Sequence, residues 1–367
     1  MLEFFPSRTV TLYIARQFAV RTVAVLAMLV VVLQMLDLLG ESGKILEVAG
    51  SGEAQLWTYV SLRLPQLVAR FLPYSVLLAT ILTLATLNQN SEVIAMKAAG
   101  LSAHQVLAPL FLTALVIAAL SFTFDQRVVA PATATLKAWQ AVDYGPMPRQ
   151  SSAKANVWLR DGNNLLFAQA VSGSGRGEPA RMQGVSWYRR DPHDIVSEIV
   201  RADAATFAAP GWRLENATAF DVQSAASRPL PAGTVIAQGV TPAQVALSKV
   251  DPEGEDIATL RRSIDALAGA GRRTAELEAA WWHKISAPLA AVLMPLLGGV
   301  AAFGLARSGQ LFLRAVIAMA LGFAFFVVDN AALAMGNFGG YPPLLAAWAP
   351  FVLFALIGET VLIRTEE

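Results

Sequence analysis

The chain has 367 residues, of which 55% are hydrophobic and 15% are charged, whereas an ordinary soluble domain carries about 25% charged residues. Its formal net charge of +1 excludes the strong electrostatic field that a nucleic-acid-binding surface or a large acidic partner requires. The absence of cysteine excludes a disulfide framework, a thiolate metal site and a thiol nucleophile. This composition favours a membrane protein.

The first hydrophobic run, at residues 22–39, follows several arginines and has the general order of a signal peptide. It is longer than the roughly 7–15 apolar residues of a signal core, and no A-x-A-like cleavage site closes it. We therefore interpret it as part of a retained first span.

Six segments carry the run of about 20 mainly apolar residues that a membrane-spanning helix needs. Basic residues in the short connections gather on one side of these spans when both termini are placed in the cytoplasm. The segment between the third and fourth spans then lies outside. The six segments are residues 10–39, 56–87, 106–124, 282–306, 313–335 and 343–363. The basic residues are Arg8, Arg16, Arg21, Lys97, Arg307, Arg314 and Arg364.

The segment between the third and fourth spans is rich in short strand patterns. Residues 156–160 and 164–170 flank Asp161-Gly162 and predict a strand, a turn and a second strand. Short strands at such spacing indicate a sandwich or a jelly roll. Further strand candidates lie at residues 184–190, 195–203 and 212–220.

The sequence therefore predicts an α-helical membrane protein with six transmembrane helices and an inserted, extracytoplasmic, all-β, jellyroll-like domain. We expect the first three spans within residues 1–140 and the β-domain at residues 141–256. Residues 257–367 would hold a connecting helix and the last three spans. The connecting helix is indicated by apolar residues that recur about every 3.6 residues between Ile257 and Leu267.

Residues suited to catalysis are few. Gly43-Lys44 is reminiscent of a nucleotide-binding loop, but Ile45 stands in place of the Ser or Thr and Leu38 in place of the first Gly. The three histidines fall in different segments without the spacing of a zinc motif. We expect no catalytic residue, no metal site and no cofactor bound by this chain. The histidines are His104, His193 and His283.

The connection between the second and third spans predicts a short helix at residues 91–99, too short to cross a membrane. Ser91 is expected to cap its first turn, Glu92 to complement its positive end, and Gly100 to end it. Two functions are open. The helix either rests on its own bundle or docks into a cytoplasmic ATPase, in which case the contacts would be Glu92, Val93, Ile94 and Met96.

Charged side chains near the membrane are costly unless they are paired or face water. Bases in the outer half of the spans can snorkel, pair locally, or contact the phosphates of an anionic amphiphile. Both functions are open for Arg63, Arg70 and Lys137. For Glu359, near the inner end of the sixth span, we expect snorkelling.

Several short motifs follow one another along almost the whole chain. They are Ser91-Glu92…Met96…Ala99-Gly100, Val129-Ala130-Pro131, Val157-Trp158…Asp161-Gly162-Asn163-Asn164, Trp282-x-Lys284-Ile285 with Pro288, and Val328-Asp329. In this order they resemble the LptF/LptG (YjgP/YjgQ) family of lipopolysaccharide export permeases. The Trp-x-x-Asp-Gly-Asn-Asn string and Tyr341-Pro342-Pro343 are more similar to the LptG branch than to the LptF branch.

The resemblance implies a permease subunit of an ABC transporter that extracts lipopolysaccharide from the bacterial inner membrane. It implies cytoplasmic termini and a periplasmic β-jellyroll that passes the lipid to a periplasmic jellyroll bridge protein. Glu92 would be the acid that contacts the ATPase. The implied partners are an LptF-like permease, an LptB-like ATPase dimer that binds ATP and Mg, and an LptC-like single-span subunit.

The resemblance also implies lateral gates at the first and fifth spans, through which the lipid enters. One departure concerns lysines of LptG relatives, whose places are taken here by Gln34, Gly40 and Glu41. Either other bases take their role, or the lipid carries less phosphate. The candidate phosphate contacts are Lys44, Arg63, Arg70 and Lys137. The candidate gate and cavity residues are Gln34, Asp37, Phe326 and Asp329.

Two alternatives remain beside this interpretation. The chain could be the LptF-type paralogue of the same complex, with the same activity. It could instead be a membrane-anchored sensor or assembly platform whose β-domain binds a partner and transports nothing. An intramembrane enzyme is disfavoured because the spans contain no paired catalytic residues.

Overall fold

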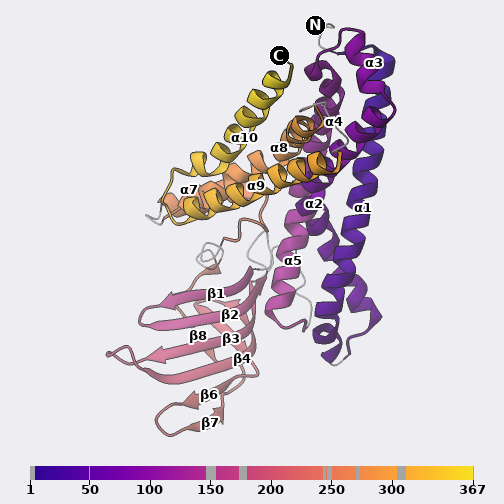
Figure 1. Cartoon of the computed structure of the whole chain (residues 1–367). Helices are drawn as coiled ribbons and strands as arrows, with labels where there is room; N and C mark the ends of the chain where they lie inside the picture. The colour runs from indigo at the N-terminus through magenta and orange to yellow at the C-terminus, as the bar shows by residue number, and fades with distance from the viewer. Residues whose placement is uncertain are drawn as a thin grey trace. The chain divides into compact units, whose positions relative to one another are not determined.

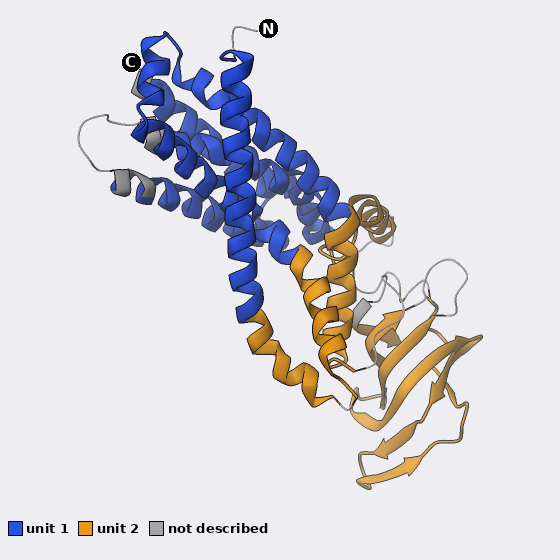
Figure 2. Ribbon diagram, turned by 90° about the vertical axis from the view of Figure 1, so that its right-hand side faces the viewer, with its two compact units in different colours: residues 1–36, 66–126, 273–367 blue, residues 37–65, 127–272 orange. Residues whose placement is uncertain are grey.

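The computed structural model describes residues 5–48, 50–145, 154–172, 180–242, 245, 250–269, 273–303 and 311–366. The chain divides into two compact units, which Figure 2 shows in different colours. Unit 1 comprises Met1–Leu36, Gln66–Gln126 and Arg273–Glu367, and unit 2 comprises Asp37–Pro65 and Arg127–Arg272. An antiparallel sheet in unit 2 interrupts the run of long helices, which confirms the predicted all-β insertion in a helical membrane protein.

The long helices are α1 (Arg8–Glu47), α2 (Glu53–Gln89), α4 (Ala103–Phe124), α8 (Ala275–Phe303), α9 (Leu311–Asn337) and α10 (Pro343–Glu366) (Figure 1). Within the described residues, 5 helical stretches are long and apolar enough to cross a membrane. They match the predicted first, second, third, fifth and sixth spans. The fourth predicted span falls on α8, a helix of 29 residues, and its passage through the membrane stays a prediction.

Small residues let the helices of unit 1 approach closely. A Cβ on Gly298 of α8 would lie 2.6 Å from Thr80 Cγ2 of α2, and one on Gly322 of α9 would lie 2.2 Å from Leu77 Cδ2. Packing of this kind replaces the hydrophobic effect as the cohesive force between helices in lipid. Helix α8 contacts α4 and α10 in the same way, because Gly299 faces Leu107 of α4 and Gly358 of α10 faces Leu296 of α8.

Helix α4 ends at Phe124, the predicted limit of the third span, but the chain remains helical beyond it. It continues through a π-helical turn, η1 (Asp125–Val129), into α5 (Ala130–Ala141). Pro131 lies in the first turn of α5, where its missing N–H and its ring disturb the regular α-helical hydrogen bonds to the preceding turn. Hydropathy alone does not reveal such a turn, because it marks only the end of the apolar run at Asp125-Gln126-Arg127.

The sheet contains β1 (Lys154–Asp161), β2 (Asn164–Ser172), β3 (Arg181–Arg190), β4 (Val196–Ala208), β5 (Gly211–Glu215), β6 (Thr218–Asp221), β7 (Ala226–Pro229) and β8 (Val235–Ile236). Its order is β1-β2-β3-β4-β5-β8, and β6 pairs with β4 and β7 (Figure 1). Consecutive strands are neighbours from β1 to β5, as in a meander. The connections are thus simpler than the Greek-key crossings of a jelly roll.

The predicted strand at residues 212–220 is two strands. Asn216 between them has φ 54°, a left-handed conformation that ends the extended run. Strand β5 consequently pairs with Ala204–Ala208 of β4, whereas β6 pairs with Glu198–Arg201 of the same strand. The 13 residues of β4 can serve both partners because they exceed the length of either.

Strands β1 to β5 and the segment that follows β8 supply the core of the β-domain. Val157, Leu166, Met182 and Trp212 have no exposed surface and belong to one buried cluster. The indole Nε1 of Trp212 donates a hydrogen bond to the Val240 carbonyl oxygen at 2.9 Å, which satisfies the one polar atom of this buried side chain.

The predicted connecting helix is α7 (Ile257–Gly269), with Leu260, Ile264 and Leu267 buried on one face. Asp256 caps it, because its Oδ1 accepts hydrogen bonds from the Ala258 and Thr259 amides at 2.9 and 2.8 Å. Burial alone would raise the pKa of this carboxyl, but the hydrogen bonds from Thr259 and Ala258 outweigh it and lower the pKa.

Asp256→Ala is expected to destabilise α7 by about 1 kcal/mol, the usual contribution of an N-cap. Because the pKa is lowered in the folded state, this contribution is complete above the ordinary carboxyl pKa and is lost as pH falls through the folded-state value. Thermal unfolding should therefore separate the variant from the parent at pH 7, and the two curves should converge in acid. A constant difference across pH would contradict the assignment.

Candidate functional site

The short helix between the second and third spans is α3 (Glu92–Ala98). Ser91 precedes it with φ 59° and makes no side-chain capping hydrogen bond, so the predicted Ser91 cap is wrong. An N-cap needs extended backbone to turn its hydroxyl towards the first amides, and the left-handed conformation does not allow this. At the other end, Gly100 has φ +89°, and the Gly100 and Leu101 amides donate to the Lys97 and Met96 carbonyl oxygens, which confirms the predicted stop as a Schellman motif.

The four predicted contact residues of α3 lie on two sides of the helix. Val93 is buried and Met96 is half-buried against the core of unit 1. Ile94 is exposed, and the half-exposed Glu92 accepts hydrogen bonds at Oε1 from Tyr13 Oη and Asn90 Nδ2, both at 3.2 Å. One side of α3 thus rests on the bundle, as the first interpretation expects, and the other presents a carboxylate and an apolar side chain to solvent. Docking into an ATPase stays a prediction.

A second polar contact lies where α4 follows α3. Ser102 and Gln105 form a reciprocal capping box at the start of α4. His104, the second residue of α4, places its Nε2 2.7 Å from Glu359 Oε1 of α10. Glu359 is therefore paired instead of simply extending to the membrane surface.

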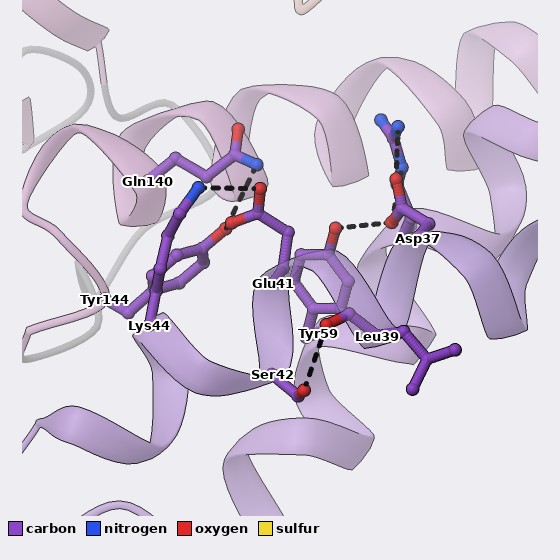
Figure 3. A network of polar contacts seen from close by, with 9 residues as sticks. Asp37, Leu39, Glu41, Ser42, Lys44, Tyr59, Gln140 and Tyr144 are labelled. Atoms are coloured by element: carbon purple, nitrogen blue, oxygen red, sulfur yellow. Dashed lines mark hydrogen bonds and ion pairs between the residues drawn. The ribbon is translucent and has the colours of Figure 1, made fainter.

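Two polar networks occupy unit 2 where the end of α1, the start of α2 and the end of α5 meet (Figure 3). In the first, the Asp37 carboxylate accepts from Arg63 Nη2 at 2.9 Å, from Arg63 Nε at 3.1 Å and from the Tyr59 hydroxyl. Such a bidentate pair fixes the guanidinium and satisfies both carboxylate oxygens.

In the second network, Glu41 accepts a hydrogen bond from the Tyr144 hydroxyl at 2.6 Å and from Lys44 Nζ at 3.0 Å (Figure 3). Burial and, to a lesser extent, the hydrogen bond to the Glu41 carboxylate raise the pKa of Tyr144 to about 12. Tyr144 is therefore a neutral donor at physiological pH. Its ring meets those of Tyr59 and Trp139 edge-on, so the two networks share one aromatic core.

Lys137 of α5 is held by acids that follow the β-domain in sequence. Its Nζ lies 2.8 Å from Asp251 Oδ2 and 2.6 Å from Glu253 Oε2. The adjoining Gly254 packs on Ala134, where an added Cβ would come within 3.1 Å of Ala134 Cβ. These contacts tie the chain that leaves the β-domain to α5.

The four candidate phosphate contacts thus differ in availability. Arg63 and Lys137 are engaged by carboxylates, whereas the Lys44 side chain is 65% exposed despite its bond to Glu41. Arg70, in α2, is exposed, and the part of the chain that the structure describes offers it no ion pair. All four roles stay predictions, and the geometry favours Lys44 and Arg70.

The candidate gate residues on α9 contact other helices of unit 1. The Phe326 ring stacks on Tyr74 of α2 with centroids 3.9 Å apart. Asp329 Oδ2 lies 3.0 Å from His283 Nε2 of α8. Lys284, which follows His283, places its Nζ 3.6 Å from Asp125 Oδ2. On α1, Gln34 is nine-tenths buried, and neither its amide oxygen nor its amide nitrogen finds a partner among the described residues.

Sequence reasoning missed the partners that neutralise these charges. A signal was present for some of them, because Tyr59 lies about one helical turn before Arg63 and can therefore face the same acid. For the pairs made by His104 and His283, the sequence shows only a histidine and a distant carboxylate. Among the described residues, no group of 3 or more His, Cys, Asp or Glu side chains could hold a metal ion.

These observations define a multi-pass helical membrane protein with a β-sheet insertion and charge pairs between its spans. Residues 12–364 match the family described as lipopolysaccharide export system permease LptF/LptG, and the chain belongs to this family. It is 26% identical over 313 residues to the lipopolysaccharide export system permease protein LptG of Escherichia coli K12, which covers 83% of this chain and 84% of the relative. It is 22% identical over 327 residues to LptG of Haemophilus influenzae, or 84% of this chain and 86% of the relative.

Proposed function

We propose that the chain is the LptG-type permease subunit of an ABC transporter that extracts lipopolysaccharide from the inner membrane. The observation that carries this function is the family match over nearly the whole chain. The curated relatives named LptG favour this branch over the LptF-type paralogue. The chain is a multi-pass inner-membrane transport subunit, and a separate cytoplasmic subunit would bind ATP and Mg and hydrolyse the nucleotide.

The proposed orientation has both termini in the cytoplasm and the β-domain in the periplasm. It is supported by the basic residues at the cytoplasmic ends of the spans, such as Arg8, Arg16, Lys97 and Arg364. Arg307 and the side chain of Arg314, which the same prediction uses, lie outside the described residues. The β-domain would then hand the lipid to a periplasmic jellyroll bridge protein.

Helix α3 would be the part of this chain that the ATPase contacts and moves. The half-exposed Glu92 carboxylate and the exposed Ile94 would contact a basic, grooved surface of an LptB-like ATPase, while Val93 and Met96 anchor α3 in its own bundle. ATPase closure would move this helix and shift the population of the spans towards a closed cavity. An LptF-like permease and an LptC-like single-span subunit complete the proposed complex.

Lipid contacts are proposed for the two available bases. Arg70 and Lys44 would bind phosphates or acidic sugars, because both are exposed and Arg70 has no competing carboxylate among the residues described. Gln34 would add an uncharged amide whose oxygen and nitrogen have no hydrogen-bond partner in the part of the chain that the structure describes. Phe326 and Asp329 would belong to the proposed gate at the fifth span, and Asp37 to the proposed gate at the first span. Affinity must fall when the cavity closes, since otherwise the lipid would not leave.

Mild purification of the intact complex from its own membrane tests this function. An affinity tag on this chain should recover a second permease of the same family and an ATPase, with lipopolysaccharide bound. Recovery of the chain alone, or only as a homodimer, would contradict the proposed transport function and favour a membrane-anchored sensor or assembly platform. Recovery of two copies of this chain with the ATPase would show that no separate LptF-type subunit is required.

A further inference from the structure

The pair formed by His104 and Glu359 joins distant parts of unit 1. The two residues are 255 positions apart, and His104 Nε2 lies 2.7 Å from Glu359 Oε1. His104 belongs to the first turn of α4, and Glu359 belongs to α10. The side chains are 25% and 46% exposed, so the contact is accessible to water and is not part of the packed core.

The connection between α3 and α4, which we call the α3–α4 elbow, runs from Ala99 to Ser102 and is held by hydrogen bonds at both ends. Helix α3 ends in the Schellman motif at Gly100, and α4 begins with the Ser102–Gln105 capping box. The two motifs are adjacent in sequence, since Leu101 closes the first and Ser102 opens the second, and Leu101 packs against the core. Because each backbone end is hydrogen-bonded, a displacement of α3 must move the first turn of α4 with it.

The other side of the pair is equally fixed. Next to Glu359, a Cβ on Gly358 would lie 2.7 Å from Leu296 Cγ, so the backbone of α10 packs directly on this side chain of α8. Leu362 and Phe354, one turn away on either side, are buried in the same core. A pull on Glu359 therefore acts on α10 and α8 together.

We infer that His104 and Glu359 are positioning residues that carry the displacement of the α3–α4 elbow to α10 and α8. This inference rests on the proposed function, in which α3 receives the motion of an ATPase. The pair is suited to transmission because a charge-assisted hydrogen bond is short and directional. It is not needed for folding, since partly exposed ion pairs contribute little to stability.

The test uses the complete transporter reconstituted in lipid nanodiscs and measures ATP hydrolysed per lipopolysaccharide released. The variant His104→Phe removes the hydrogen bond, and Glu359→Gln removes the charge that assists it. Each should keep ATP hydrolysis near the parent's rate and raise the ATP-to-lipid ratio by at least about fivefold, the lower range of coupling between sites. The same substitution at the exposed His193 of the β-domain, His193→Phe, is the matched control and should leave the ratio unchanged.

The exchanged variant, His104→Glu with Glu359→His, should restore the ratio because it rebuilds the contact with the partners reversed. If both single variants keep the parental ratio, or if the exchange rescues nothing while the protein remains assembled, the inference is overturned. Absence of ATP-dependent release by the parent complex would instead overturn the proposed function. A purely structural role would lower the yield of assembled complex without changing the ratio in the molecules that assemble.

Discussion

Glu92→Ala is expected to reduce ATP-driven lipopolysaccharide release at least about tenfold, because truncating a charged anchor at a protein interface commonly costs ~2 kcal/mol or more. The fold should be retained, since the two hydrogen bonds of Glu92 within the chain are long, at 3.2 Å, and half-exposed. Release from nanodiscs into a soluble acceptor, measured together with thermal unfolding, separates the two effects.

Tyr13→Phe is the matched control for this prediction. It removes the hydroxyl that donates to Glu92 but leaves the carboxylate in place, and it should therefore keep release near the parental rate. If Tyr13→Phe were as harmful as Glu92→Ala, the contact with α1 would explain the effect and the docking role would fail. Unchanged release by Glu92→Ala would contradict the coupling assignment directly.

Asp37→Ala should lower the free energy of unfolding by about 2 kcal/mol, because it leaves Arg63 and Tyr59 without their shared acceptor in a half-buried position. Replacing both charged partners, as Asp37→Leu with Arg63→Leu, should recover the part of that loss that comes from the unpaired guanidinium. Thermal unfolding in detergent followed by tryptophan fluorescence measures both. A double variant as unstable as the single one would show that the pair is not the source of the loss.

The same series distinguishes a structural base from a lipid-binding base. Arg70→Ala should leave the unfolding temperature unchanged and weaken lipopolysaccharide capture, because this exposed guanidinium holds no carboxylate within the described residues. The double variant Asp37→Leu with Arg63→Leu should instead capture lipopolysaccharide as the parent does. Loss of capture in this variant would show that Arg63 contacts the lipid.

The hydrophobic spans and the inserted sheet could be predicted from the sequence because both leave periodic signals. Long apolar runs gave five of the six spans to within a few residues at most ends, and alternation with Asp161-Gly162 gave the β1–β2 hairpin. The break at Asn216 could not be predicted, because asparagine is tolerated within a strand as well as in the left-handed conformation. Strands β7 and β8, with four and two residues, are too short to show a pattern.

The candidate sites were predicted as residue types but not as pairs. Charged residues in apolar spans pointed to Asp37, Arg63 and Asp329, since a charge there requires a partner or water. Which partner each one has depends on how helices pack, and His283 reaches Asp329 across 46 residues of sequence. The Gln34 amide has no hydrogen-bond partner among the described residues, and this too depends on helix packing and could not be predicted from the sequence.

The division of β4 between two partners gives the β-domain a detachable part. The β6–β7 hairpin is held to β4 by four residue pairs, from Glu198–Asp221 to Arg201–Thr218, and by the ion pair between Arg228 and Glu198, and all of β7 is exposed. Opening so short a ladder exposes little buried apolar surface, so this hairpin belongs to the least protected class of structure in native-state hydrogen exchange. Its opening would expose residues 198–201 on one edge of β4 while β1 to β5 and the core around Trp212 stay intact, so the domain can offer an unpaired strand edge without unfolding.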